Sequence, residues 1–177
     1  MSDAGQDNLR SAFRMLAGGR MEALETIWQQ SAGSLHGYAF ALTGDTDEAD
    51  DILSEVVAKL LRSGWRLRWV RNPKAYLFAA VRNATRDRAE RRTRAESVGL
   101  DNTTEPTVRD PAAAVAILSA VMALPGEQRE AVVLHIWGGL TFGEIGRLTG
   151  APTATATSRY RYGLEKLRRA LRETCDE

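Results

Sequence analysis

The sequence predicts an all-α fold made of two small helical domains, and three observations support this. Apolar residues recur over long stretches with the 3.6-residue period of helices. No run of alternating β-branched residues indicates a strand. The polar segment 94–112, which contains Pro106 and Pro111, interrupts the periodicity. We therefore predict a helical domain over residues 1–93, a flexible linker over 94–112 and a second helical domain over 113–177.

The composition is typical of a folded protein without membrane segments, disulfides or metal sites. The chain has 177 residues, of which 44% are hydrophobic and 27% charged, as in folded water-soluble proteins. No secretory signal or run of roughly 18 apolar residues is evident, so we expect a cytoplasmic protein without membrane insertion. Cys175 has no second cysteine to pair with, and it lies far in sequence from His36 and His135. We therefore expect no disulfide, metal site or cofactor.

Charge is unevenly distributed, although the net charge is only +1. Residues 45–55 hold six acidic side chains and no basic one, whereas residues 62–94 hold ten arginines and one lysine against two acids. A second basic block covers residues 159–172. Two separate basic blocks suggest two contacts with a polyanion such as nucleic acid. The alternative interpretation is that these blocks are merely solvated helix faces.

The first distinct helix is predicted over residues 46–62. Its apolar residues form one buried stripe with spacings of three and four: Ala49, Ile52, Leu53, Val56, Val57, Leu60 and Leu61. Asp45 is placed to cap its start, and Glu48 is placed to complete a capping box. The opposite, acidic face includes Asp51 and Glu55, which we expect to be exposed.

A second helix is predicted from Asn72-Pro73 to about Arg92, because asparagine caps helices well and proline suits their first position. The segment before it places Trp65 and Trp69 among arginines. Aromatic rings beside arginines suit stacking on unpaired bases with neutralisation of phosphates. Alternatively, the two tryptophans are core residues four positions apart on one helix face.

The C-terminal part predicts a helix-turn-helix. A helix begins near Gly126 and ends before Gly138-Gly139, and Thr141 with Glu144 forms the capping box of a short helix that ends at Gly150. A long basic helix follows from about residue 153. Such a pair, joined by a tight turn, can place its second helix in the major groove of DNA.

Two motifs that would imply another function are incomplete in this sequence. Residues 47–50 spell Asp-Glu-Ala-Asp, but the phosphate-binding loop that a helicase also needs does not occur. The same stretch lacks the glycine and glutamate of a calcium loop. We therefore predict that the chain is not an enzyme, and we interpret His36 and His135 as structural.

Three stretches of the chain resemble extracytoplasmic-function sigma factors of the sigma-70 superfamily. LTGDTDEADDILSEVVAKLL resembles the region that binds the clamp helices of the polymerase β′ subunit, and NPKAYLFAAVRNATRDRAERR resembles the helix that binds the −10 promoter element. The stretch from LPGEQREAVV to EKLRRAL resembles the helix-turn-helix that binds the −35 element. The resemblance covers about residues 20–92 and 113–172. The extra domains of primary sigma factors are not evident, which suggests the group of sigma factors with the fewest domains.

The resemblance implies a function and its residues. The chain would bind core RNA polymerase, through the β′ clamp helices and the β flap, and direct transcription initiation, with an anti-sigma factor as a possible further partner. Polymerase binding would fall to Asp50, Asp51, Leu53, Glu55 and Val56. Binding of the −10 element as a single strand would fall to Arg66, Arg68, Arg71, Asn72, Lys74, Tyr76, Arg82, Asn83 and Arg86. Binding of the −35 duplex would fall to Thr155, Thr157, Ser158, Arg159, Arg161 and Tyr162.

The chain departs from the family pattern at Ser54, Val57 and Thr157, so neither the promoter sequence nor the genes controlled follow from the sequence. Two alternatives remain. A stand-alone helix-turn-helix repressor would explain the C-terminal half and would bind duplex DNA without polymerase. A nuclease that uses the acidic cluster would show metal-dependent turnover.

Overall fold

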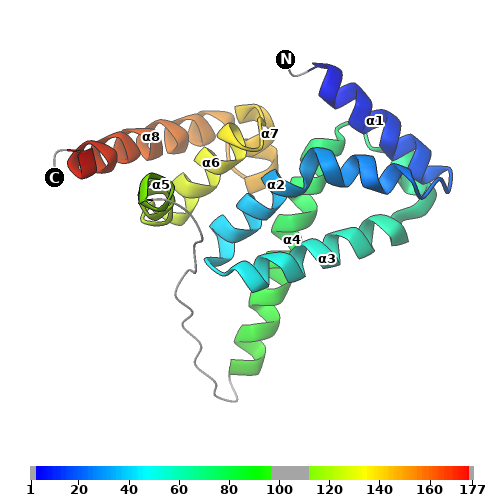
Figure 1. The fold of residues 1–177 in the computed structure, drawn as a ribbon, viewed down its shortest axis with the longest axis horizontal. Helices are drawn as coiled ribbons and strands as arrows, with labels where there is room; N and C mark the ends of the chain where they lie inside the picture. The colour runs from blue at the N-terminus through cyan, green and yellow to red at the C-terminus, as the bar shows by residue number, and fades with distance from the viewer. Residues whose placement is uncertain (1–2, 97–111, 176–177) are drawn as a thin grey trace.

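The computed structural model describes residues 3–96 and 112–175, and every regular element in those two stretches is helical, which confirms the all-α prediction (Figure 1). The elements are α1 Asp3–Ala17, α2 Ala23–Thr43, α3 Thr46–Ser63, the 3-10 helix η1 Gly64–Trp69, α4 Pro73–Glu96, α5 Ala112–Met122, α6 Gly126–Ile136, α7 Phe142–Thr149 and α8 Thr153–Cys175. Helices α1–α4 with η1 form the N-terminal domain, and α5–α8 form the C-terminal domain.

The turn between α2 and α3 follows from local chemistry. Gly44 ends α2 in the left-handed conformation, with φ of 78°, which glycine adopts without strain. The carboxylate of Asp45 then accepts a hydrogen bond of 2.8 Å from the amide of Glu48, so the predicted cap is confirmed. The reciprocal half of the capping box is replaced: the Asp45 amide donates to the Thr43 hydroxyl at 3.2 Å, and Glu48 pairs with Arg92 at 3.6 Å.

Helix α4 begins as predicted and ends later. The amide of Ala75 donates to the side-chain oxygen of Asn72 at 3.0 Å, so Asn72 caps the helix and Pro73 is its first residue. The helix continues to Glu96, three residues into the predicted linker, and the rest of the linker up to residue 111 lies outside the described residues.

The two tryptophans before α4 are not core residues. They lie on η1, where only Leu67 is buried, and Trp65 and Trp69 are 64% and 72% exposed. The interpretation that they share a buried helix face is therefore wrong. Large exposed rings in a polar neighbourhood remain available to a partner.

The C-terminal domain contains the predicted helix-turn-helix. Thr141 and Glu144 form a complete capping box at the start of α7, and Gly150 ends α7 in the left-handed conformation. The turn to α8 is tight, because a Cβ at Gly146 would lie 2.6 Å from the carbonyl oxygen of Ala151. This close approach fixes the angle at which α8, the predicted recognition helix, leaves the domain.

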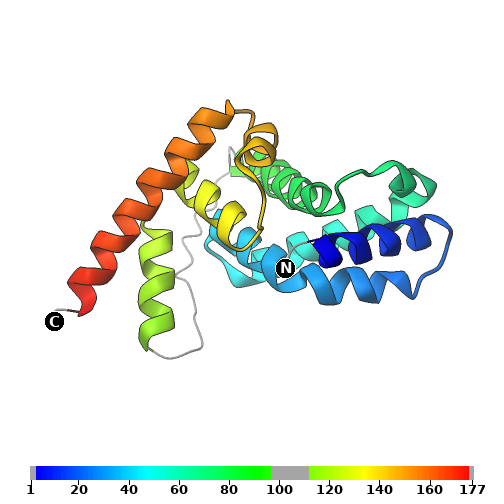
Figure 2. The same ribbon diagram turned by 90° about the horizontal axis from the view of Figure 1, so that it is seen from above.

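The two domains pack against each other through α6 and α2 (Figures 1 and 2). One guanidinium nitrogen of Arg129, on α6, donates to the carbonyl oxygen of Ala41 in the last turn of α2 at 3.0 Å. A cation at the end of a helix complements its exposed carbonyls. A second nitrogen of Arg129 donates to Leu124 at 3.2 Å, and burial lowers the pKa of this side chain. The contact between the domains therefore includes a partly buried charge held by carbonyl oxygens.

Candidate nucleic-acid interface

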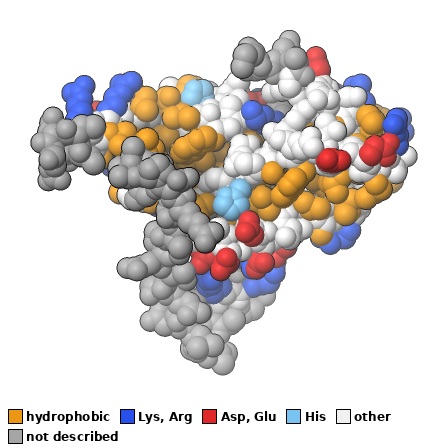
Figure 3. Space-filling model, in the orientation of Figure 1, with side chains coloured by type: hydrophobic (Ala, Val, Ile, Leu, Met, Phe, Trp, Pro, Cys, Tyr) orange, Lys and Arg blue, Asp and Glu red, His pale blue; other side chains and the backbone are white. Residues whose placement is uncertain are grey.

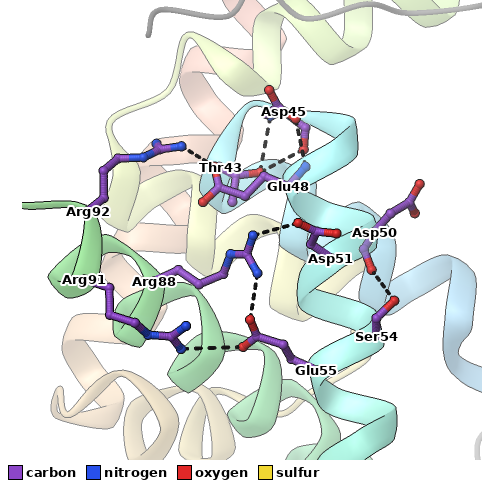
Figure 4. Close-up of polar contacts among 10 residues, drawn as sticks. All are labelled: Thr43, Asp45, Glu48, Asp50, Asp51, Ser54, Glu55, Arg88, Arg91 and Arg92. Atoms are coloured by element: carbon purple, nitrogen blue, oxygen red, sulfur yellow. Dashed lines mark hydrogen bonds and ion pairs between the residues drawn. The ribbon is translucent and has the colours of Figure 1, made fainter. Parts of the chain in front are cut away.

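The acidic face of α3 divides into two sides, and one of them is bound to α4 (Figure 4). Arg88 donates to Asp51 at 2.8 Å and to Glu55 at 2.7 Å, and Arg91 approaches Glu55 at 3.7 Å. Burial alone would lower the pKa of Arg88, but its hydrogen bonds to Glu55 and Asp51 outweigh burial and raise that pKa. Acidic and basic side chains accordingly adjoin where α3 crosses α4 (Figure 3).

Two predictions about α3 can be compared with the structure. Asp51 and Glu55 were expected to lie on an exposed face, and Asp51 is exposed whereas Glu55 is half-buried. Both bind Arg88 within the domain, because α4 crosses α3 on that side. Leu53 and Val56 were expected to take part in polymerase binding, yet both are buried in the core. They belong to the apolar stripe of α3, so they support the helix and offer no surface to a partner.

Another stripe of α3 faces outward. It consists of side chains at alternating spacings of three and four residues: Asp47, Asp50, Ser54, Val57 and Leu61. Asp50 and Ser54 point away from Arg88 in Figure 4, and Leu61 is 41% exposed. The hydroxyl of Ser54 donates to the backbone of Asp50 at 3.0 Å, and the Asp50 carboxylate lies 3.3 Å from His36. This outward stripe combines carboxylates at one end with apolar side chains at the other.

Five of the residues predicted to bind the −10 element are exposed: Arg66, Arg68, Arg71, Asn83 and Arg86. The guanidinium carbon of Arg68 lies 5.9 Å from the centre of the Trp69 ring, a cation–π distance. Arg86 forms a weak ion pair of 3.5 Å with Glu90 one turn along α4. These side chains thus present positive charge next to exposed aromatic rings.

Four other predicted −10 residues are engaged inside the protein. Asn72 donates to the Glu144 carboxylate, and Arg82 donates to Glu130 at 2.9 Å, so both contact the C-terminal domain. The ammonium nitrogen of Lys74 lies next to Gly139 of the C-terminal domain: a Cβ added to this glycine would be 2.8 Å from that nitrogen. Tyr76 is half-buried, with its hydroxyl 3.1 Å from that of Ser63. The C-terminal domain covers three of these side chains because α6 and α7 lie against α2 and α4.

Glu130 joins three helices of the two domains. One carboxylate oxygen accepts hydrogen bonds from the hydroxyl of Tyr38 on α2 at 2.7 Å and from Arg82 on α4 at 2.9 Å. Tyr38 is fully buried, and its burial, followed by the negative charge of Glu130, raises the pKa of its hydroxyl well above the ordinary range. Sequence reasoning missed Glu130 and Arg129, since nothing local marks residues whose partners in the other domain lie 48 or more positions away.

The N-terminal half of α8 presents the predicted −35 residues with one exception. Thr157, Arg161 and Tyr162 are exposed, and Thr155 and Ser158 are half-buried. Arg161 lies 5.2 Å from the Tyr162 ring and has no acidic partner among the described residues. The exception is Arg159, which is only 24% exposed and binds Glu127 on α6.

No group of three or more His, Cys, Asp or Glu side chains within the described ranges is placed to hold a metal ion. Among the same residues, no helix combines the length and apolarity needed to cross a membrane. His135 has a structural role, since its ring nitrogen lies 2.9 Å from the Leu140 carbonyl and its ring stacks on Phe142 at 4.5 Å.

Comparison with known families matches both domains. Residues 27–95 match sigma-70 region 2, and residues 114–167 match sigma-70 region 4. The chain is 30% identical to the RNA polymerase sigma factor CarQ of Myxococcus xanthus over 88% of its length and 92% of that relative. The chain is an extracytoplasmic-function sigma factor of the sigma-70 family.

Further relatives agree with this assignment. The chain is 29% identical to the sigma factor EcfG of Rhodopseudomonas palustris, over 76% of this chain and 77% of that one. Its fold resembles the sigma factor RpoE of Bartonella quintana in complex with the anti-sigma factor NepR, with a TM-score of 0.69 and 20% identity over 86% of this chain and 98% of that one. CnrH in complex with the cytosolic domain of CnrY gives a TM-score of 0.64 over 94% and 98% of the two chains. As a sigma factor, the chain acts with core RNA polymerase on promoter DNA.

Proposed function

We propose that this sigma factor divides its work among three surfaces: the outward stripe of α3 binds core polymerase, the basic surface of η1 and α4 binds the −10 element, and the start of α8 binds the −35 element. The observation that carries the proposal is that exposed basic side chains occur on both matched sigma-70 regions, while the acidic surface lies on a separate helix. The protein itself makes and breaks no bonds, and it acts in the cytoplasm with the polymerase.

The outward stripe of α3 suits a basic helical partner such as the β′ clamp helices. Asp47 and Asp50 are exposed and supply negative charge, whereas Val57 and Leu61 supply apolar area about two and three turns beyond Asp50. Electrostatic attraction would speed the encounter, and apolar burial would supply affinity. Asp51 and Glu55 support this surface indirectly, by fixing α3 against Arg88.

The −10 surface works fully only when the domains separate. Arg66, Arg68 and Arg71 are exposed in the packed state, but Asn72 and Arg82 hold carboxylates of the C-terminal domain. A guanidinium that binds Glu130 has lost a donor that a phosphate would need. We therefore infer that binding of the complete −10 element competes with packing of α6 and α7 on the N-terminal domain.

The −35 surface is the exposed side of α8. Thr157 and Arg161 lie one turn apart and face the same way, as side chains that enter one groove must. Arg161 is free to reach a phosphate or a guanine, whereas Arg159 would first have to leave Glu127. Much of the duplex affinity would come from phosphates and would fall with salt.

An anti-sigma factor is a proposed partner. The similar fold of RpoE was determined with the anti-sigma factor NepR bound to it, and the similarity extends over most of both sigma chains. A protein that held the two domains together would keep the −10 residues covered. This regulator would therefore act on the same contact that Glu130 makes.

In vitro transcription tests the proposal. The purified protein is mixed with bacterial core polymerase and fragmented genomic DNA, and transcript starts are mapped by sequencing. We expect discrete starts that share paired −35 and −10 motifs and are absent without the protein. No starts with a folded protein and a matched core would contradict the proposal, and footprints on duplex DNA without polymerase would favour a repressor.

Variants of α3 test the polymerase surface. The double variant Asp47→Lys, Asp50→Lys reverses two charges of the outward stripe without touching Arg88 and is expected to weaken core binding. Asp87→Lys is the matched control, because Asp87 is an exposed aspartate of α4 with no partner among the described residues. Equal core affinity of the double variant and the control would remove α3 from the proposal.

A further inference from the structure

The N-terminal helix α1 lies outside the sigma-70 region 2 match, which begins at residue 27, yet it is firmly attached to that region. Leu9, Phe13 and Leu16 are buried, and the Phe13 ring packs edge-on against Tyr76 of α4 at 5.9 Å. Arg10 ties the helix to the loop before α4, since its Nε donates to the backbone oxygen of Arg71 at 3.2 Å. One face of α1 is thereby held beside η1.

A hollow of about 480 Å³ opens between α1 and η1. Its lining contains four arginines and no acidic residue: Arg10 and Arg14 from α1, Arg68 from η1 and Arg71 from the loop. Trp69 also lines it and exposes most of its ring. Asp7 lies 3.3 Å from Arg10, whereas Arg14 has no hydrogen-bonding or ionic partner among the described residues.

Four like charges around one hollow repel each other unless an anion lies between them. Arginine binds phosphate through paired donors in a fixed fork. The exposed ring of Trp69 adds a second requirement, because it can stack on a base only if that base has left its duplex. The hollow therefore fits the backbone of an unpaired strand better than it fits a duplex or a lone phosphate.

We propose that α1 supplies Arg10 and Arg14 as phosphate-binding residues for the melted promoter strand, which extends the −10 surface beyond the part of the chain that matches region 2. This inference rests on the proposed −10 role of η1. The strand would lie between α1 and η1, with neighbouring phosphates held by Arg10 and Arg14 on one side and by Arg68 and Arg71 on the other. A base next to one of these phosphates would stack on Trp69.

The test is the binding of a fluorescent twelve-nucleotide oligothymidine to the full-length protein, measured by anisotropy at several salt concentrations. For single strands, each phosphate contact contributes about 0.7 to the slope of log affinity against log salt. Arg10→Ala with Arg14→Ala removes two contacts, so the slope is expected to fall by about 1.4 and the affinity at 0.1 M salt by about 25-fold. A twelve-base-pair duplex is expected to bind more weakly and to be less affected.

Arg20→Ala is the matched control, since Arg20 is an exposed arginine that pairs with Glu22 at 2.8 Å and does not line the hollow. It is expected to bind like the unaltered protein. The single variant Arg14→Ala tests whether the effect comes from a displaced loop rather than from lost phosphate contacts, because Arg10, and not Arg14, is hydrogen-bonded to Arg71. This variant is expected to lower the slope by about 0.7. Circular dichroism confirms that each variant is folded.

Unchanged slope and affinity in the double variant would overturn the proposal, and so would an unaltered protein that does not bind the single strand. Transcription by the unaltered protein separates this outcome from failure of the proposed function. Discrete starts together with unaffected oligonucleotide binding in the double variant would leave a sigma factor whose α1 does not contact the strand.

Discussion

Replacing Glu130 by alanine removes the carboxylate that joins the two domains. Its oxygen accepts from Tyr38 at 2.7 Å and from Arg82 at 2.9 Å, and the side chain is only 12% exposed. A hydrogen bond to a charged group contributes about 1.5–3 kcal/mol. Because Arg82 is 30% exposed and water would replace part of its bond, we expect a total loss of about 3 kcal/mol. That is a change of about 100-fold in the ratio of packed to separated domains.

Two measurements read out this change. Small-angle X-ray scattering is expected to show a larger radius of gyration for Glu130→Ala, and calorimetry is expected to show a lower melting temperature or two separate transitions. Glu165→Ala is the control, since Glu165 is an exposed glutamate of the same domain whose nearest cation lies 3.8 Å away within α8. Glu130→Gln keeps the shape and an acceptor oxygen, so its effect is expected to be smaller.

A double-mutant cycle assigns the loss to the contact itself. Tyr38→Phe removes one donor, so the double variant with Glu130→Ala should lose less than the sum of the two single variants. Unaltered melting and scattering of Glu130→Ala would refute the reasoning, because they would show that the carboxylate does not hold the domains together. Full additivity would show that Tyr38 and Glu130 act independently.

Other substitutions test the helix contacts. Arg88→Ala is expected to lower the free energy of unfolding by about 1–2 kcal/mol in urea titrations, since Glu55 is only partly exposed, and the loss should shrink in high salt. A Cβ at Gly163 would lie 2.8 Å from a methyl group of Val132, so Gly163→Ala is expected to cost about 1–3 kcal/mol by thermal melting; a more stable variant would show that α6 and α8 can move apart. The raised pKa of Tyr38 means that its hydroxyl stabilises the fold fully below about pH 10, and this contribution disappears as the pH rises further. Tyr38→Phe should therefore lose less stability than the unaltered protein above about pH 10.

Helix boundaries were predictable where a single short segment determines them. Asn72 caps α4, and Thr141 forms its box with Glu144, because each interaction spans three residues and needs no distant partner. Helix α1 was not assigned, although Leu9, Phe13 and Leu16 already carry helical spacing. The apolar stripe of α3 likewise contained the information that its leucines and valines are largely interior.

Charge pairing between helices was not predictable. The stretch that includes Asp51 and Glu55 looks like one acidic surface in the sequence, but its availability depends on where Arg88, 33 or more residues away, lies after folding. The same holds for Arg82, a basic residue of a basic helix that proves to bind a carboxylate of the other domain. The sequence identifies which residues are charged, whereas the tertiary structure determines which of these charges are neutralised by a partner within the protein.

With the proposed −10 surface, the contact of Arg82 with Glu130 couples polymerase binding to promoter recognition. The single N–H of the Arg82 Nε cannot donate to a carboxylate and a phosphate at once, so packing of the domains competes with full −10 binding at this residue. A ligand shifts such an equilibrium only by its different affinity for the two states. Core polymerase that binds the two domains apart would remove the packing penalty from DNA binding, to which the Glu130 contact contributes about 100-fold, and DNA would strengthen polymerase binding by the same factor by which polymerase strengthens DNA binding. Glu130→Ala should therefore increase −10 binding by the free protein much more than by the holoenzyme, and an equal increase in both would show that the packed state does not restrain the free sigma factor.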